Sequence, residues 1–128
     1  MISVPLFILF FAVPPDKYSS FVPDPKTVKT KENILEIQNL IELFKKDNMR
    51  YPTTDEGLDA LVRNPDPDKY PGYKTYIQSL PMDPWGKHYQ FLSPGTHGDF
   101  DIYSFGVDGK QSDDDIGSWE LGTRIPEK

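Results

Sequence analysis

Four aspartates lie close together near the end of this chain, in the segment between Phe105 and Ile116. They are Asp108, Asp113, Asp114 and Asp115. Four like charges in one loop repel one another unless a cation or solvent offsets the repulsion. Calcium takes about six to eight oxygen ligands, backbone carbonyls among them. Gly106 and Gly109 would let the chain turn its carbonyls inward. The segment is therefore either a calcium loop or a solvated acidic turn.

The spacing of these carboxylates differs from that of the helix–loop–helix calcium motif. That motif needs the pattern D-x-[DN]-x-[DN]-G and a closing glutamate, and the chain has neither here. A hydrolytic site is a further interpretation, but a general acid and base need a cleft that raises the pKa of one carboxyl. Consecutive aspartates between glycines are expected to be hydrated and ionised, so the sequence does not favour hydrolysis.

No nucleophile or phosphate motif accompanies the aspartates. The two histidines, His88 and His97, stand beside turn residues, without a second histidine at helical spacing and without a Gly-x-Ser-x-Gly motif. The absence of cysteine excludes disulfides and thiolate metal sites. A formal net charge of −6 and a pI of about 4.8 argue against nucleic acid as a partner. We therefore expect that the chain is not an enzyme.

The chain has the length of one domain, which we expect to span residues 25–128. Residues 1–24 precede this domain, and the run from Met1 to Val13 is almost entirely apolar. As a helix this run would rise roughly 18 Å, against about 30 Å for the hydrocarbon core of a membrane. We interpret it as a shortened or degenerate membrane anchor, or as a segment that packs on the domain.

A long amphipathic helix is predicted from Pro25 to Asn48. Asp24 is the expected N-cap, followed by proline at the first helical position. Leu35 falls on the polar side and is expected to be exposed. The side chains expected to face the core occupy about half of the helical wheel and are Ile34, Ile37, Leu40, Ile41, Leu43 and Phe44.

A second, shorter helix is predicted after residue 52, because residues 53–56 (TTDE) have the pattern of a capping box. Its apolar face would be Leu58, Leu61 and Val62. Two strands are then predicted at residues 89–92 and 100–105, joined as a hairpin through the turn residues between them. A third short strand is expected near residues 118–122. The order of elements predicts an α+β fold.

Six segments of the chain have the order and composition of motifs in one protein family. They are residues 47–58 (DNMRYPTTDEGL), 80–90 (LPMDPWGKHYQ), 93–98 (SPGTHG), 101–104 (DIYS), 106–109 (GVDG) and 114–119 (DDIGSW). Over roughly residues 28–122 the chain thereby resembles the major pseudopilins of type II secretion systems. The resemblance implies a pilin-like fold, in which the long N-terminal helix packs on a small three-stranded antiparallel sheet with a C-terminal calcium loop.

The resemblance also implies a metal site. One calcium ion would be held by the side chains of Asp108 and Asp114 and by the backbone carbonyls of Phe105 and Ser112. Asp115 is a further candidate ligand. Bound calcium would stabilise the last third of the domain, because a ligand that binds only the folded loop lowers only the free energy of the folded state.

The role implied by the resemblance is that of a structural subunit of a periplasmic pseudopilus, which drives export of folded proteins from the periplasmic side of the Gram-negative inner membrane. The implied partners are other copies of the chain, minor pseudopilins and the inner-membrane secretion platform. The chain lacks the Gly-Phe-Thr-Leu-x-Glu motif of the family's N-terminus, which leaves membrane anchoring open. The alternative is a free, calcium-stabilised periplasmic or secreted interaction module derived from a pseudopilin head.

Two further expectations concern the matched segments. Trp85 is expected to fill the core beside the long helix. Met49 stands where the family has a small residue, and we therefore expect Asn48 to take the left-handed conformation that ends the helix.

Overall fold

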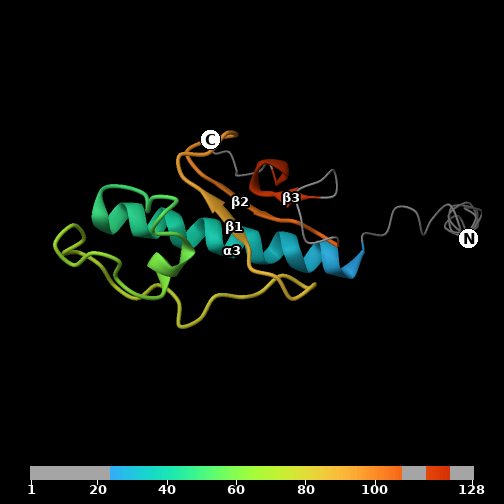
Figure 1. Cartoon of the computed structure of the whole chain (residues 1–128), viewed down its shortest axis with the longest axis horizontal. Coiled ribbons are helices and arrows are strands. Elements are labelled where there is room, and N and C mark those ends of the chain that lie inside the picture. Colours follow the sequence, from blue (N-terminus) through green and yellow to red (C-terminus); the bar gives the residue numbers. More distant parts are fainter. Residues whose placement is uncertain (1–23, 108–114, 122–128) are drawn as a thin grey trace, which may run out of the picture.

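The structure is a computed structural model that describes residues 24–107 and 115–121. One long helix lies along a three-stranded antiparallel sheet, so the predicted α+β fold is confirmed (Figure 1). The elements are α3 (Pro25–Asn48), the 3-10 helix η1 (Leu58–Leu61), β1 (Gln90–Leu92), β2 (Asp101–Ser104), β3 (Ile116–Gly117) and the 3-10 helix η2 (Ser118–Glu120). The predicted N-terminal segment, up to residue 23, lies outside the described residues.

The helix α3 has the predicted bounds and the predicted N-cap. The Thr27 amide donates to the Asp24 carboxylate at 3.2 Å, which satisfies one of the free N–H groups of the first turn. Leu35 is exposed, as expected, but the assignment of Leu43 to the buried face is wrong, because its side chain is 48% exposed. Leu43 follows Ile34 by about two and a half turns and therefore points away from the sheet.

The left-handed residue that ends α3 lies one position later than expected. Met49, not Asn48, is left-handed, with φ 68°, and its amide donates to the Lys45 carbonyl. Asn48 stays helical because its buried side-chain amide donates to the Phe44 carbonyl and to the Tyr76 hydroxyl. The expectation for Asn48 is therefore wrong, and the strained position falls on an exposed methionine.

The second predicted helix is wrong in its extent. The capping box forms, since the Thr53 amide donates to the Glu56 carboxylate at 2.9 Å and the Glu56 amide to the Thr53 hydroxyl at 3.1 Å. The chain then leaves the helical conformation at Gly57, with φ 69° and ψ −175°. Only the short η1 follows, and it buries Leu58 and Leu61 as predicted.

The sheet has the order β1-β2-β3, and both neighbouring pairs are antiparallel. The predicted hairpin is confirmed, since Phe91 pairs with Ile102. The third strand lies earlier than expected, at Ile116–Gly117, and the segment predicted to be strand begins with η2 instead. The ring of Trp119, in η2, packs on Gly117 at a distance that leaves no room for a Cβ.

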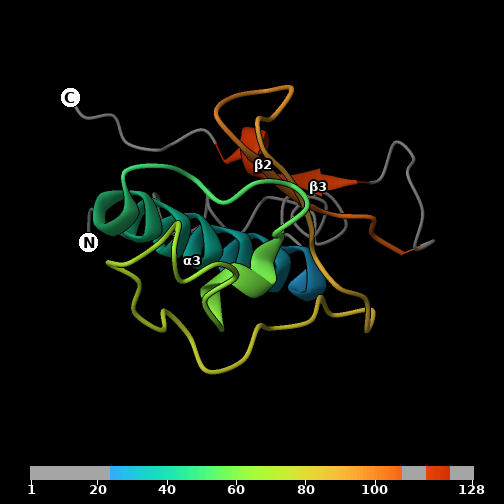
Figure 2. The same ribbon diagram turned by 60° about the vertical axis from the view of Figure 1, so that its left-hand side comes forward.

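One apolar core joins these elements. The sheet lies on one side of α3, and the proline-rich connection of residues 62–89 runs along the other (Figures 1 and 2). Trp85 packs against this core but is only partly buried. The buried apolar residues are Ile34, Ile37, Ile41, Phe44, Leu58, Ala60, Leu61, Tyr70, Tyr89, Phe100, Ile102 and Ile116. Among the described residues, no helix has both the length and the apolar character needed to cross a membrane.

Candidate calcium loop and its supports

The predicted ligand loop connects β2 to β3. These strands pair Tyr103 with Gly117 and Ser104 with Ile116. The next position of this antiparallel register holds Phe105 on one strand and Asp115 on the other. Two of the predicted ligands therefore stand at the two ends of the loop, at its base. The remaining predicted ligands, Asp108, Ser112 and Asp114, lie outside the described residues.

Tyr103, in β2, is affected by the negative charge at the base of the loop. Burial raises the pKa of the Tyr103 hydroxyl, and the charges of Asp115 and Asp101 raise it further. In residues 24–107 and 115–121 there is no group of three or more His, Cys, Asp or Glu that could hold a metal. The predicted donor set is composed of oxygens alone, which is the set that calcium prefers.

A buried aspartate, Asp83, supports the first end of this loop. One of its oxygens accepts the amides of Trp85 and Lys87, at 3.1 and 2.8 Å. Its other oxygen accepts the Ser104 hydroxyl at 2.8 Å, and that hydroxyl accepts the Gly106 amide at 3.0 Å. Asp83 is 3% exposed and Ser104 is fully buried. The turn of residues 83–87 is thereby joined to the start of the loop.

The local sequence explains this turn. The Gly86 amide donates to the Asp83 carbonyl, and Gly86 has φ 82°, a conformation that glycine adopts without strain. The Asp83 amide in turn donates to the Lys87 carbonyl at 2.8 Å. Pro81, Pro84 and Gly86 indicate a turn here from the sequence alone, whereas the role of Asp83 becomes evident only in the fold. An aspartate followed by proline and glycine is a recognised turn signal, but its burial depends on Ser104, which is distant in sequence.

A second buried carboxylate, Asp101, holds the β1–β2 turn against η2. It accepts the Thr96 amide and hydroxyl, both at 2.9 Å, and lies 3.0 Å from His97 Nδ1. Burial alone would raise the pKa of the Asp101 carboxyl, but the hydrogen bonds from His97 and Thr96 outweigh burial and lower it. The His97 ring stacks on Trp119, with centroids 3.9 Å apart. His97 therefore has a structural partner in Trp119.

A shallow hollow of about 320 Å³ lies beside this contact, between α3 and the end of the sheet. Gln38 and Glu42 line it from the helix, and Asp99 and Trp119 line it from the opposite side. Of the aspartates that the hydrolytic interpretation invoked, Asp108, Asp113 and Asp114 lie outside the described residues.

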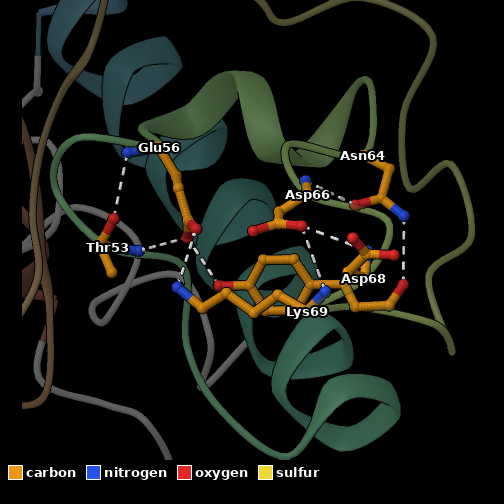
Figure 3. Close-up of polar contacts among 7 residues, drawn as sticks. Thr53, Glu56, Asn64, Asp66, Asp68 and Lys69 are labelled. Atoms are coloured by element: carbon orange, nitrogen blue, oxygen red, sulfur yellow. Dashed lines mark hydrogen bonds and ion pairs between the residues drawn. The ribbon is translucent and has the colours of Figure 1, made fainter.

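Glu56 is the third carboxylate with several donors (Figure 3). Besides the Thr53 amide it accepts the Tyr70 hydroxyl at 2.6 Å and the Lys69 ammonium at 3.0 Å. Burial alone would raise the pKa of this carboxyl, but the hydrogen bonds from Tyr70 and Thr53 and the Lys69 ammonium outweigh burial and lower it. The cluster fastens the segment before η1 to residues 66–70, and its role is structural.

The helix-on-sheet arrangement with a hairpin loop at one end defines a pilin-like head. A solved structure, the major pseudopilin from the type 2 secretion system of enterohaemorrhagic Escherichia coli, matches it with a TM-score of 0.73 and 39% identity. The match covers 82% of this chain and 98% of that chain.

The family described as Type II secretion system (T2SS), protein G matches residues 19–119, and the chain belongs to this family. Two relatives named Type II secretion system core protein G are those of Dickeya chrysanthemi, 46% identical over 99 residues, and Aeromonas hydrophila, 50% identical over 97. Each match covers 73% of this chain, and it covers 64% of the first relative and 68% of the second. The chain thus spans about two thirds of their length. Their names describe a component of a secretion system rather than an enzyme.

Proposed function

We propose that this protein is a structural subunit of a periplasmic type II secretion pseudopilus. In this role, copies of the chain pack with one another and with minor pseudopilins above an inner-membrane platform, and the assembly drives export of folded proteins. The observation that carries the proposal is the agreement of the whole helix-and-sheet head with a major pseudopilin at 39% identity. The polar supports described above serve to hold this head in shape.

The test is removal of the gene in the host of this protein. The expected result is that folded secretion substrates accumulate in the periplasm, and that re-expression of the gene returns them to the medium. Site-directed crosslinking between copies should give a ladder of multimers. If secretion is unchanged and the protein stays monomeric, the alternative of a free interaction module replaces the pseudopilus.

The head is further proposed to hold one calcium ion in the β2–β3 loop. The side chains of Asp108 and Asp114 and the carbonyls of Phe105 and Ser112 would bind it, with Asp115 as a further ligand. Supporting this assignment, Phe105 and Asp115 occupy the two ends of the loop, and the donors are oxygens throughout. Calcium would neutralise the clustered negative charge and so stabilise the folded loop.

A further inference from the structure

We propose that the outward face of α3 joins one copy of the chain to the next in the pseudopilus. In this contact the first half of the helix in one copy lies beside the second half of the helix in its neighbour. The inference rests on the proposed function and adds to it the surface through which the copies meet. This surface lies within residues 28–49, all of which the structure describes.

Exposed apolar side chains are concentrated on this helix. Four of the large apolar side chains that are exposed in the described residues belong to α3 or its C-cap. Val28 and Leu35 lie in the first half, and Leu43 and Met49 lie in the second. Val28 and Leu35 are within about 20° of each other around the axis, and Val28 lies about half a turn from the buried Ile37. A row of apolar side chains on one outward face indicates a surface that another molecule covers.

The charges on this face differ between its two halves. Glu32 stands between the two apolar residues of the first half, and Lys46 stands between the two apolar residues of the second. Both charged side chains are exposed, and neither makes a hydrogen bond or an ion pair with another described residue. Each half is thus an apolar pair around one free charge, and the two charges are opposite in sign. The two halves of the face are therefore complementary to each other.

A shift along the helix axis brings the two halves of neighbouring copies together. The shift is 14 residues, the separation of Glu32 and Lys46 in the sequence, and corresponds to about 21 Å. With both helices pointing the same way, Glu32 of one copy then lies opposite Lys46 of the next. Leu35 of the first copy lies opposite Met49 of the second, because these two residues are also 14 positions apart.

Other pairings of the same face satisfy fewer charges or end after two copies. Parallel helices without a shift would place Glu32 against Glu32 and Lys46 against Lys46, and like charges repel. An antiparallel pair would oppose Glu32 and Lys46 but would close as a dimer. The shifted parallel pairing also brings Lys29 of one copy toward Glu42 of the next, at the edge of the contact. Each copy presents different halves to its two neighbours, and a contact of this kind extends into a filament.

The test is disulfide crosslinking between copies of the full chain in its host, since the chain has no cysteine of its own. The double variant Leu35→Cys/Met49→Cys should give a ladder of multimers under an added oxidant, because each copy would be linked to two neighbours. Each of the two single variants should give no ladder. Asn39→Cys is the control on the same face. Asn39 is exposed and lies midway between Glu32 and Lys46, so it would meet its own counterpart only in an antiparallel dimer.

Charge reversal gives an independent test in the same double-cysteine background. Glu32→Lys and Lys46→Glu should each reduce the yield of multimers by about two- to fivefold. The two reversals together should restore the yield, because the opposite charges then face each other again. Glu120→Lys makes the same change of charge at an exposed position of η2 and should leave the yield unchanged. All four side-chain changes are at the surface, so the melting temperature of the head should stay the same.

Three outcomes would overturn the inference. If Leu35→Cys/Met49→Cys gives no ladder while an amine-reactive crosslinker still joins wild-type copies, the copies meet through other surfaces, and the proposed pseudopilus stands. A disulfide-linked dimer of Asn39→Cys without a ladder from the double variant would assign this face to an antiparallel pair instead. If no crosslinker joins copies and removal of the gene leaves secretion unchanged, the proposed function fails, and this inference fails with it.

Discussion

Replacing Glu56 by alanine should destabilise the head more than its position near the surface suggests. The Glu56 side chain is only 15% exposed and accepts three hydrogen bonds. The largest cost arises at Tyr70, whose residue is fully buried, because a buried hydroxyl whose proton loses its acceptor costs about 1–3 kcal/mol. Solvent screens the ion pair between Lys69 and Glu56, so this pair adds little. We expect a total loss of about 1–3 kcal/mol.

The assay is urea unfolding at pH 7, with Asp59→Ala as the control. Asp59 pairs with Arg63 on the surface, where both side chains are more than half exposed, and its loss should cost less than about 1 kcal/mol. Tyr70→Phe completes a double-mutant cycle with Glu56→Ala. The two losses should not add, because both remove the same hydrogen bond.

The same cluster makes a prediction about acid. The pKa of Glu56 is lowered on folding from its ordinary value of 4.5. The unfolded chain therefore takes up this proton first, and the stability that Glu56 contributes is present above pH 4.5 and is lost as the pH falls through the folded pKa. Glu56→Ala should lack this part of the acid-induced loss. A Glu56→Ala protein within about 0.5 kcal/mol of the wild type at pH 7 would refute the argument.

Two other substitutions test the backbone assignments. Gly117→Ala would place a methyl group into the Trp119 ring, so the ring must leave its stack on His97. We expect a loss of about 1–3 kcal/mol and an altered tryptophan near-UV signal, and an unaltered signal would contradict the packing. Met49→Gly should stabilise the head by about 1 kcal/mol, because it relieves a left-handed residue whose side chain is 84% exposed. A lower melting temperature would contradict that assignment.

The sequence predicted the elements whose signals are local. The helix α3 was predicted with its bounds, because the N-cap at Asp24 and the periodic spacing of its buried isoleucines are short-range features. The hairpin of β1 and β2 followed from turn residues between two apolar runs. The second helix failed because a capping box fixes only one turn, and Gly57 then left the helical conformation. The third strand was misplaced because β3 is defined by its pairing with β2, a contact between residues distant in sequence.

Less of the candidate site than of the fold could be predicted from the sequence. The acidic loop is visible as composition, but its ligand set came from the resemblance to a family, and only Phe105 and Asp115 lie among the described residues. The supports of the loop could not be predicted from spacing. Asp83 becomes a buried acceptor only when Ser104 meets it across the fold. In the same way, His97 gains its role only when Trp119 packs against it.

The most direct test of the account is thermal unfolding of the full chain in EDTA, in calcium and in magnesium. We expect EDTA to lower the melting temperature, calcium to restore it and magnesium to restore much less. At calcium concentrations about a hundredfold above the dissociation constant, the gain should be about 2.7 kcal/mol. Asp108→Ala and Asp114→Ala should abolish the response. Equal melting temperatures of the wild type with and without calcium would contradict the assignment of a calcium loop.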